Sequence, residues 1–213
     1  MNILYERIKK IYFVLFFLSP KLLSTIIFIP FLYICGWILA TPIFLLGVDK
    51  ENLSLIGTIF TFFIYVFSLP KWFKLRWGVN NTWTLLGINK IDKNANLLIF
   101  FLRGFLLSII LISLIYIPII GTKWGYWIGT ISPNTFINAF FLLLGVGFAE
   151  ELIFRGWLLE ELKNQFGLKK AILGQALIFS IVHIGFDLPF LQMLSILTGL
   201  FLLGILLSLI RLK

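Results

Sequence analysis

Residues 97–121 read LLIFFLRGFLLSIILISLIYIPIIG, a run whose only charged residue, Arg103, lies near its start. Residues 190–210 form a second continuously apolar run. A helix of about 20 apolar residues crosses the hydrocarbon core of a bilayer, whereas the strands of a membrane barrel alternate in polarity over short segments. Because lipid offers the backbone no hydrogen bonds, these runs predict an all-α, polytopic transmembrane helical bundle. Arg103 can extend its side chain to the headgroups.

The composition agrees with a membrane protein, since 60% of the residues are hydrophobic and the mean hydropathy is +1.04. About six spans are predicted, at residues 22–47, 53–69, 97–121, 135–159, 171–186 and 190–210. Residues 1–21 place basic side chains before a short apolar run without a small-residue cleavage site, so we predict an N-terminal interfacial segment. The remainder divides into an N-terminal transmembrane region, 22–134, and a C-terminal region, 135–213.

The charge distribution predicts the orientation of the chain. The net charge is +9, and the basic residues fall mostly in segments that face one side if both termini are cytoplasmic. The outer loops then keep only Lys50 and Lys123. We therefore interpret the positive charge as an orientation signal and expect no nucleic-acid partner. The expected location is a cell membrane, in a multi-pass protein, and the frequent Phe, Ile, Lys and Asn residues suit an AT-rich bacterial genome.

Tryptophans mark the segment 71–96, which is predicted to be a loop along the inner membrane surface. Trp72, Trp77 and Trp83 lie there among basic residues. Indole rings favour the headgroup zone, where their faces are buried and the ring N–H stays hydrated. This loop therefore needs no binding role. Cys35 is the only cysteine, so no internal disulfide is expected.

Three charged residues directly follow the apolar run 136–149, and they are the first candidates for function. Glu150 and Glu151 are followed by Arg155. A charge near the centre of a bilayer helix costs about 2.5–3.5 kcal/mol, so each of these residues needs a partner. Glu151 and Arg155 are one helical turn apart and can form an ion pair, whereas Glu150 points about a quarter turn away. Glu150 is thus left as the free acid.

The candidate partner of Glu150 is His183, the only histidine in the chain. It lies one helical turn after Phe179, whose ring can restrict the imidazole. Alternatively, His183 is a polar residue satisfied by a serine or by the backbone. Nearby polar side chains either line a cavity with it or form interhelical hydrogen bonds, namely Gln175, Ser180, Gln192 and Ser195.

The pattern E-E-x-x-x-R, from Glu150 to Arg155, and the pattern F-x-x-x-H, from Phe179 to His183, resemble the first two signatures of the CAAX protease and bacteriocin-processing (CPBP) family. That family includes Rce1-type prenyl-protein proteases, Abi-type membrane peptidases and many bacteriocin self-immunity proteins. The resemblance covers about residues 135–213. It implies an all-helical intramembrane endopeptidase.

The resemblance also implies roles for the motif residues. Glu150 is the general base that activates water, and His183 holds that water or stabilises the developing oxyanion. Glu151 and Arg155 form a supporting ion pair, and Phe179 supports the histidine. Glu150 and His183 are also the candidate ligands if a divalent metal such as zinc takes part.

The chain departs from the family pattern at its end. The family pattern continues with a helix that carries a second histidine and an asparagine, whereas this sequence ends at Lys213 with one histidine. The C-terminal region is therefore expected to lack the last family helix, and a zinc site of two histidines and a carboxylate is not expected. Three explanations stay open: a truncated gene, action without hydrolysis, or groups supplied by other residues or another subunit.

Two functions follow. The first is an intramembrane endopeptidase that cuts a peptide or lipidated peptide near the inner leaflet, with glutamate- or metal-dependent chemistry. The alternative is a non-catalytic member that acts as a bacteriocin self-immunity or other partner-binding membrane protein. The expected partners are the substrate and the lipid bilayer, and the sequence does not indicate an oligomeric state.

Overall fold

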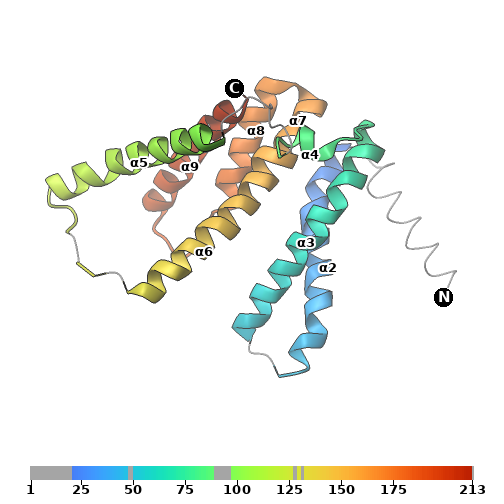
Figure 1. The fold of residues 1–213 in the computed structure, drawn as a ribbon, viewed down its shortest axis with the longest axis horizontal. Coiled ribbons are helices and arrows are strands. Elements are labelled where there is room, and N and C mark those ends of the chain that lie inside the picture. The colour runs from blue at the N-terminus through green and yellow to red at the C-terminus, as the bar shows by residue number, and fades with distance from the viewer. Residues whose placement is uncertain (1–20, 48–49, 89–96, 127–128, 131, 213) are drawn as a thin grey trace. The chain divides into compact units, whose positions relative to one another are not determined.

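The computed structural model describes residues 21–47, 50–88, 97–126, 129–130 and 132–212, and within them every regular element is a helix. The predicted all-α class is confirmed. The elements are α2 (Lys21–Phe44), α3 (Lys50–Trp77), α4 (Thr82–Leu85), α5 (Leu97–Gly121), α6 (Pro133–Glu150), η2 (Glu151–Leu158), α7 (Leu159–Phe166), α8 (Leu168–Ile181) and α9 (Phe190–Arg211) (Figure 1). The predicted interfacial segment 1–21 lies, except for Lys21, outside the described residues.

Within the described ranges, 4 helices are long and apolar enough to cross a membrane, and they correspond to the predicted spans 22–47, 53–69, 97–121 and 190–210. The predicted span 135–159 belongs to a continuous helical run of α6, η2 and α7. The predicted span 171–186 is shorter than expected, because α8 has 14 residues and is about 21 Å long. The total of six spans and the cytoplasmic termini stay predictions.

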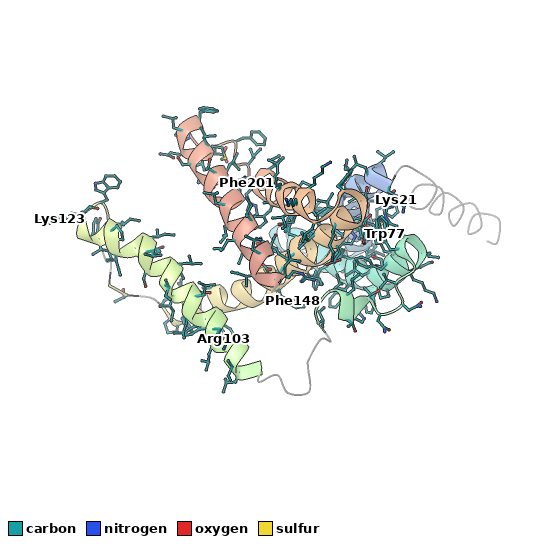
Figure 2. The ribbon with its side chains drawn as sticks, turned by 90° about the horizontal axis from the view of Figure 1, so that it is seen from above. Lys21, Trp77, Arg103, Lys123, Phe148 and Phe201 are labelled. Carbon is teal, nitrogen blue, oxygen red and sulfur yellow. The ribbon has the colours of Figure 1, made fainter. Side chains whose placement is uncertain are left out.

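The chain forms two compact units. Residues 88–146 make up one of them, with α5 and most of α6. The described side chains of α5 are largely exposed apolar groups, and its most apolar window has 0% of its residues buried, which suits contact with lipid. Arg103 lies toward the start of α5 and is exposed, as expected for a side chain that reaches the headgroups, and Lys123 follows the end of the helix (Figure 2).

The other unit begins with α2 and α3, which run antiparallel and side by side (Figure 1). Gly36 permits their close approach, because a Cβ atom there would lie 2.7 Å from the carbonyl oxygen of Gly57. The end of α3 returns to the start of α2, where the Nζ atom of Lys21 lies 3.9 Å from the centre of the Trp77 ring (Figure 2). These two helices therefore form a tightly packed pair.

An aromatic cluster joins this helical pair to η2. The ring of Phe28 lies 4.0 Å from that of Trp72 and 5.2 Å from that of Trp157, and Tyr65 packs edge-on against Trp157 at 6.4 Å. Side chains from α2, α3 and η2 thus share one hydrophobic core. Helices on the two sides of the 88–146 segment consequently belong to one packed body.

The structure corrects the interpretation of the segment 71–96 as a loop with headgroup tryptophans. α3 continues through Pro70 to Trp77, and α4 follows at Thr82–Leu85. Trp72 is 0% exposed and packs in the core, so its predicted place among the headgroups is wrong. Packing against Phe28 favours continuation of the helix past the proline, at which one backbone hydrogen bond is lost.

Hydrogen bonds connect α8 to α9. Ser208 donates to Oε1 of Gln175 at 2.6 Å, and Ser180 donates to the carbonyl of Leu197 at 2.7 Å. Ser195 bonds to a carbonyl one turn earlier in its own helix at 2.9 Å. Of the two sequence alternatives, interhelical hydrogen bonding is therefore the one that Gln175 and Ser180 adopt.

Candidate active site

Glu150 and His183 lie next to each other, as the sequence predicted. Glu150 is the last residue of α6, and His183 lies in the turn after α8. The Oε1 atom of Glu150 is 3.7 Å from Nε2 of His183, and their side chains are 35% and 34% exposed. This distance is longer than a direct hydrogen bond, and it allows one water molecule to contact both groups. The pair is therefore partly exposed at the protein surface and not enclosed in the packed core.

Phe179 holds the imidazole of His183 in two ways. Its carbonyl oxygen lies 2.7 Å from Nδ1, and its ring packs edge-on against the imidazole at 4.9 Å. A carbonyl can only accept, so Nδ1 carries the proton and donates this hydrogen bond. In the neutral ring, Nε2 is then an acceptor that faces Glu150. The backbone contact that the sequence offered as one alternative is present at Nδ1, and Nε2 lies near the predicted partner Glu150 without a direct hydrogen bond to it.

The predicted ion pair of Glu151 and Arg155 is present. Nη1 of Arg155 lies 3.2 Å from Oε1 of Glu151. The guanidinium is 1% exposed and lies 4.0 Å above the ring of Phe179, whereas Glu151 is 51% exposed. Arg155 is therefore the buried member, and it supports the residue that in turn holds His183. Its role in positioning this residue stays a prediction.

The backbone around these charges differs from the expected α-helix. Residues Glu151–Leu158 form a π-helix, in which each turn is wider and the backbone carbonyls bond one residue farther along. The hydroxyl of Tyr65 donates to the carbonyl of Leu152 at 3.1 Å in the buried core. A tertiary hydrogen bond thus satisfies a backbone group of the wide turn, which residue spacing could not reveal. Short π-helical segments occur frequently at functional sites.

The donor set does not fit a closed zinc site. The described residues contain no group of three or more His, Cys, Asp or Glu side chains close enough to hold a metal ion. Glu150 and His183 provide two donors, whereas zinc sites in proteins use three or four protein ligands.

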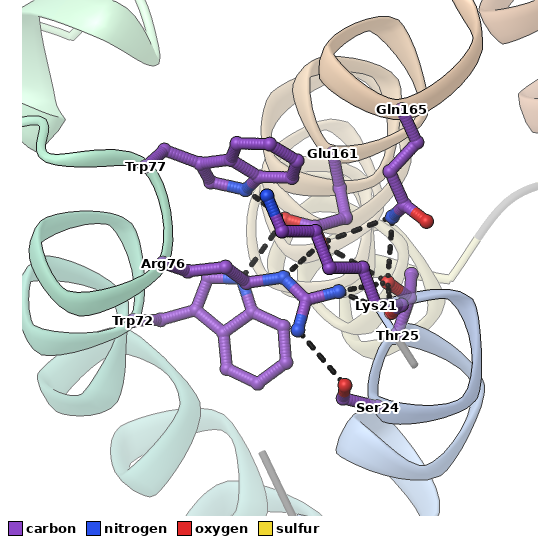
Figure 3. Close-up of polar contacts among 8 residues, drawn as sticks. All are labelled: Lys21, Ser24, Thr25, Trp72, Arg76, Trp77, Glu161 and Gln165. Atoms are coloured by element: carbon purple, nitrogen blue, oxygen red, sulfur yellow. Dashed lines mark hydrogen bonds and ion pairs between the residues drawn. The ribbon is translucent and has the colours of Figure 1, made fainter. Parts of the chain in front are cut away.

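A second charged cluster was not identified from the sequence. The carboxylate of Glu161, in α7, is 0% exposed and accepts hydrogen bonds from Trp72 at 3.0 Å and from Trp77 at 2.7 Å (Figure 3). Arg76 forms an ion pair with it, and Thr25 donates to it at 3.0 Å. We call this group the Glu161 cluster, and its members are Lys21, Ser24, Thr25, Trp72, Arg76, Trp77, Glu161 and Gln165.

The Glu161 cluster connects three helices. Arg76 donates to Ser24 at 2.9 Å, to Thr25 at 3.0 Å and to the carbonyl of Lys21, and Gln165 donates to Glu161 at 3.2 Å (Figure 3). Donors from α2, α3 and α7 surround one carboxylate, so its charge is well compensated. The sequence contains one signal, a second Glu-Glu pair at 160–161, but the basic residues around Arg76 favour a surface loop over a buried helix end.

The geometry defines the class: a helical membrane protein with an accessible acid–histidine pair beside a buried arginine. Comparison with known proteins relates the C-terminal part of the chain to a family. Residues 132–213 match the type II CAAX prenyl endopeptidase Rce1-like family, which confirms the resemblance seen in the two motifs. Residues 7–81 match a domain of unknown function, DUF8676. No curated protein and no solved structure matches the chain.

The Rce1-like match includes every candidate residue of the site, namely Glu150, Glu151, Arg155, Phe179 and His183. The Glu161 cluster, in contrast, combines residues from both matched segments. Lys21, Trp72 and Arg76 lie within 7–81, and Glu161 lies within 132–213. The two matched segments therefore meet in one packed body.

Proposed function

We propose that the protein is an intramembrane endopeptidase that hydrolyses a peptide bond near the inner leaflet. The observation that carries this proposal is the 3.7 Å separation of the Glu150 carboxylate and the His183 imidazole, both about one-third exposed, in a segment that matches a prenyl endopeptidase family. The substrate class that fits is a peptide or lipidated peptide held at the membrane.

The proposed reaction uses one water molecule between the two side chains. Glu150 takes a proton from the water while the water oxygen attacks the carbonyl carbon of the scissile peptide bond. Nε2 of the neutral His183 accepts a hydrogen bond from the other O–H of the water, which keeps that hydrogen, because the Nδ1 proton is donated to the carbonyl of Phe179. Collapse of the tetrahedral intermediate breaks the C–N bond, and Glu150 returns its proton to the leaving amine.

The hydrogen bond of Phe179 favours water holding over oxyanion stabilisation for His183. While Nδ1 donates to the carbonyl of Phe179, only the doubly protonated, cationic imidazole has an Nε2 proton to donate to an oxyanion, and the adjacent Glu150 is then engaged in an ion pair with it. The water-holding role needs only the neutral ring in the observed orientation. It therefore requires no change of the tautomer during the reaction.

The test compares membranes from cells that express the protein or its Glu150→Gln variant, which keeps the shape of the side chain and lacks the base. New peptide N-termini are identified by mass spectrometry of the membrane fraction. The expected result is a set of cleavages that the variant loses while its membrane level is unchanged. The control is Glu160→Gln, another acid-to-amide change in the same helical run, where Glu160 pairs with Lys163 at 3.0 Å.

A cleaved peptide found in this way is then synthesised and incubated with the purified protein in ¹⁸O-labelled water. Attack by water places one ¹⁸O atom in the new carboxyl group. Absence of any cleavage that depends on Glu150 refutes the proposal. If the Glu150→Gln variant retains the cellular phenotype as well, the non-catalytic immunity or partner-binding alternative is the better explanation.

A further inference from the structure

An apolar cavity of about 360 Å³ lies between α2, the η2–α7 run and α8. Its lining is almost entirely aliphatic and aromatic, and it includes Thr25. Apolar cavities of about 150 Å³ already accept a benzene ring, so this one has room for more than one apolar side chain. Its size and composition match those of ligand sites in proteins.

Two lining residues connect the cavity with the residues around the Glu150–His183 pair. Val182 lines it and directly precedes His183, and Phe154 lines it from η2. The ring of Phe154 packs edge-on against Phe179 at 5.1 Å, and Phe179 contacts the imidazole of His183 at 4.9 Å. A peptide whose carbonyl group lies at the pair can therefore place a neighbouring apolar side chain in the cavity.

Helix α2 forms one wall of the cavity, and the Glu161 cluster fixes that wall. Thr25 lines the cavity and also donates to Glu161 at 3.0 Å. Arg76 binds Thr25 and Ser24 on the same helix. The position of α2 relative to α7 therefore depends on this buried carboxylate and its donors, in addition to the aromatic core around Phe28.

We propose that the Glu161 cluster helps to determine substrate specificity. The cluster holds α2 in place and thereby sets the width of the cavity. This width determines which apolar side chain of the substrate fits beside Glu150 and His183. This inference rests on the proposed endopeptidase function. The occupant is an apolar side chain of the substrate peptide next to the scissile bond. The selecting wall then lies outside the segment that matches the Rce1-like family.

The first experiment changes the wall and leaves the Glu150–His183 pair intact. Ile26 lines the cavity and is 61% exposed, so Ile26→Phe narrows the cavity without disturbing the core. Ile34, on the same helix and 58% exposed, is not among the lining residues, and Ile34→Phe is the matched control. The readout is the residue distribution around the Glu150-dependent cleavage sites.

Ile26→Phe is expected to shift cleavage toward smaller side chains, by about fourfold for each methylene group that no longer fits. Ile34→Phe is expected to leave the distribution unchanged. If both variants keep the original distribution, the inference is wrong while the endopeptidase function stands. If Ile26→Phe instead releases a co-purifying lipid and leaves the cleavage sites unchanged, the occupant is a lipid chain and the inference is also wrong.

The second experiment needs no substrate. In a Cys35→Ser background, Ile29→Cys is labelled with N-alkyl maleimides of increasing chain length, and Ile34→Cys is the control. Labelling at position 29 is expected to slow as the alkyl chain lengthens, and labelling at 34 is not. Thr25→Val removes the hydroxyl that bonds Glu161, and it is expected to weaken this length dependence.

Equal length dependence at positions 29 and 34 overturns the inference, even if no substrate has been found. Retention of the full length dependence in both Thr25→Val and Arg76→Met overturns the role of the cluster. The milder Thr25→Val variant keeps the test valid if Arg76→Met does not fold. Absence of all Glu150-dependent cleavage refutes the endopeptidase function by itself, and the labelling result is then read separately.

Discussion

Replacing Arg76 by methionine tests the buried ion pair with Glu161. The side chains are 2% and 0% exposed, and Met keeps the apolar stem while removing the guanidinium. Glu161 is then a buried carboxylate without its cation, although Trp72 and Trp77 still donate to it. Breaking such a pair by removing one member costs about 3–5 kcal/mol.

Helix α7 provides a control pair. Lys163 pairs with Glu160 at 3.0 Å; the side chain of Lys163 is 38% exposed and that of Glu160 is 8% exposed, so this pair is only partly buried. Lys163→Met is therefore expected to cost less stability than Arg76→Met, whose pair is buried on both sides. Both variants remove the cation of a pair whose carboxylate lies in α7, and exposure of the cation is the main difference between them.

The measurement is thermal unfolding of the purified protein in one detergent or nanodisc preparation. A loss of 3–5 kcal/mol corresponds to a midpoint lower by roughly 6–20 °C for a chain of this size. The double variant Arg76→Met with Glu161→Leu should lose less than the sum of the two single variants, because neither charge is stranded. Equal midpoints for Arg76→Met and Lys163→Met would show that the Arg76–Glu161 pair contributes no more than the partly buried Lys163–Glu160 pair.

Other contacts give further tests. Phe179→Leu keeps the backbone carbonyl that accepts from His183 but removes the ring beside the imidazole. The rate of peptide cleavage should therefore fall several-fold while the amount of protein in the membrane is normal. An unchanged cleavage rate argues against a positioning role for the ring. Gly36→Ala should lower stability by about 1–3 kcal/mol, because the added methyl group overpacks α2 against α3. Gly199→Ala is the control, since the space around its Cβ position is open. The thermal unfolding midpoints of the two variants test this difference. Arg155→Ala should reduce membrane abundance, measured by immunoblotting, less than loss of Arg76 does, because its carboxylate partner is half exposed; an equal loss contradicts this order.

Local spacing predicted much of the fold and of the site. The bounds of α5 equal the predicted run 97–121, and α9 agrees with the run 190–210 to within one residue. The ion pair of Glu151 and Arg155 also followed from spacing, because residues one turn apart on a helix are neighbours. In each case the deciding contacts are close in sequence.

The parts that the sequence did not reveal depend on distant contacts. Glu161 and Arg76 are 85 positions apart, so no helical period relates them. The buried position of Trp72 follows from Phe28 and Trp157, which lie on other helices. An indole beside lysines has the same local sequence in a headgroup loop and at a buried helix end, and only packing distinguishes the two.

The shared carboxylate at Glu161 has a practical consequence for protein engineering. A chimera that transplants residues 132–213 alone carries a buried acid without the tryptophan, threonine and arginine donors that satisfy it. Such a graft would also expose the faces of η2 and α7 that pack on the first helical pair. Exchange of this region between homologues should therefore transfer α2 and α3 together with residues 132–213.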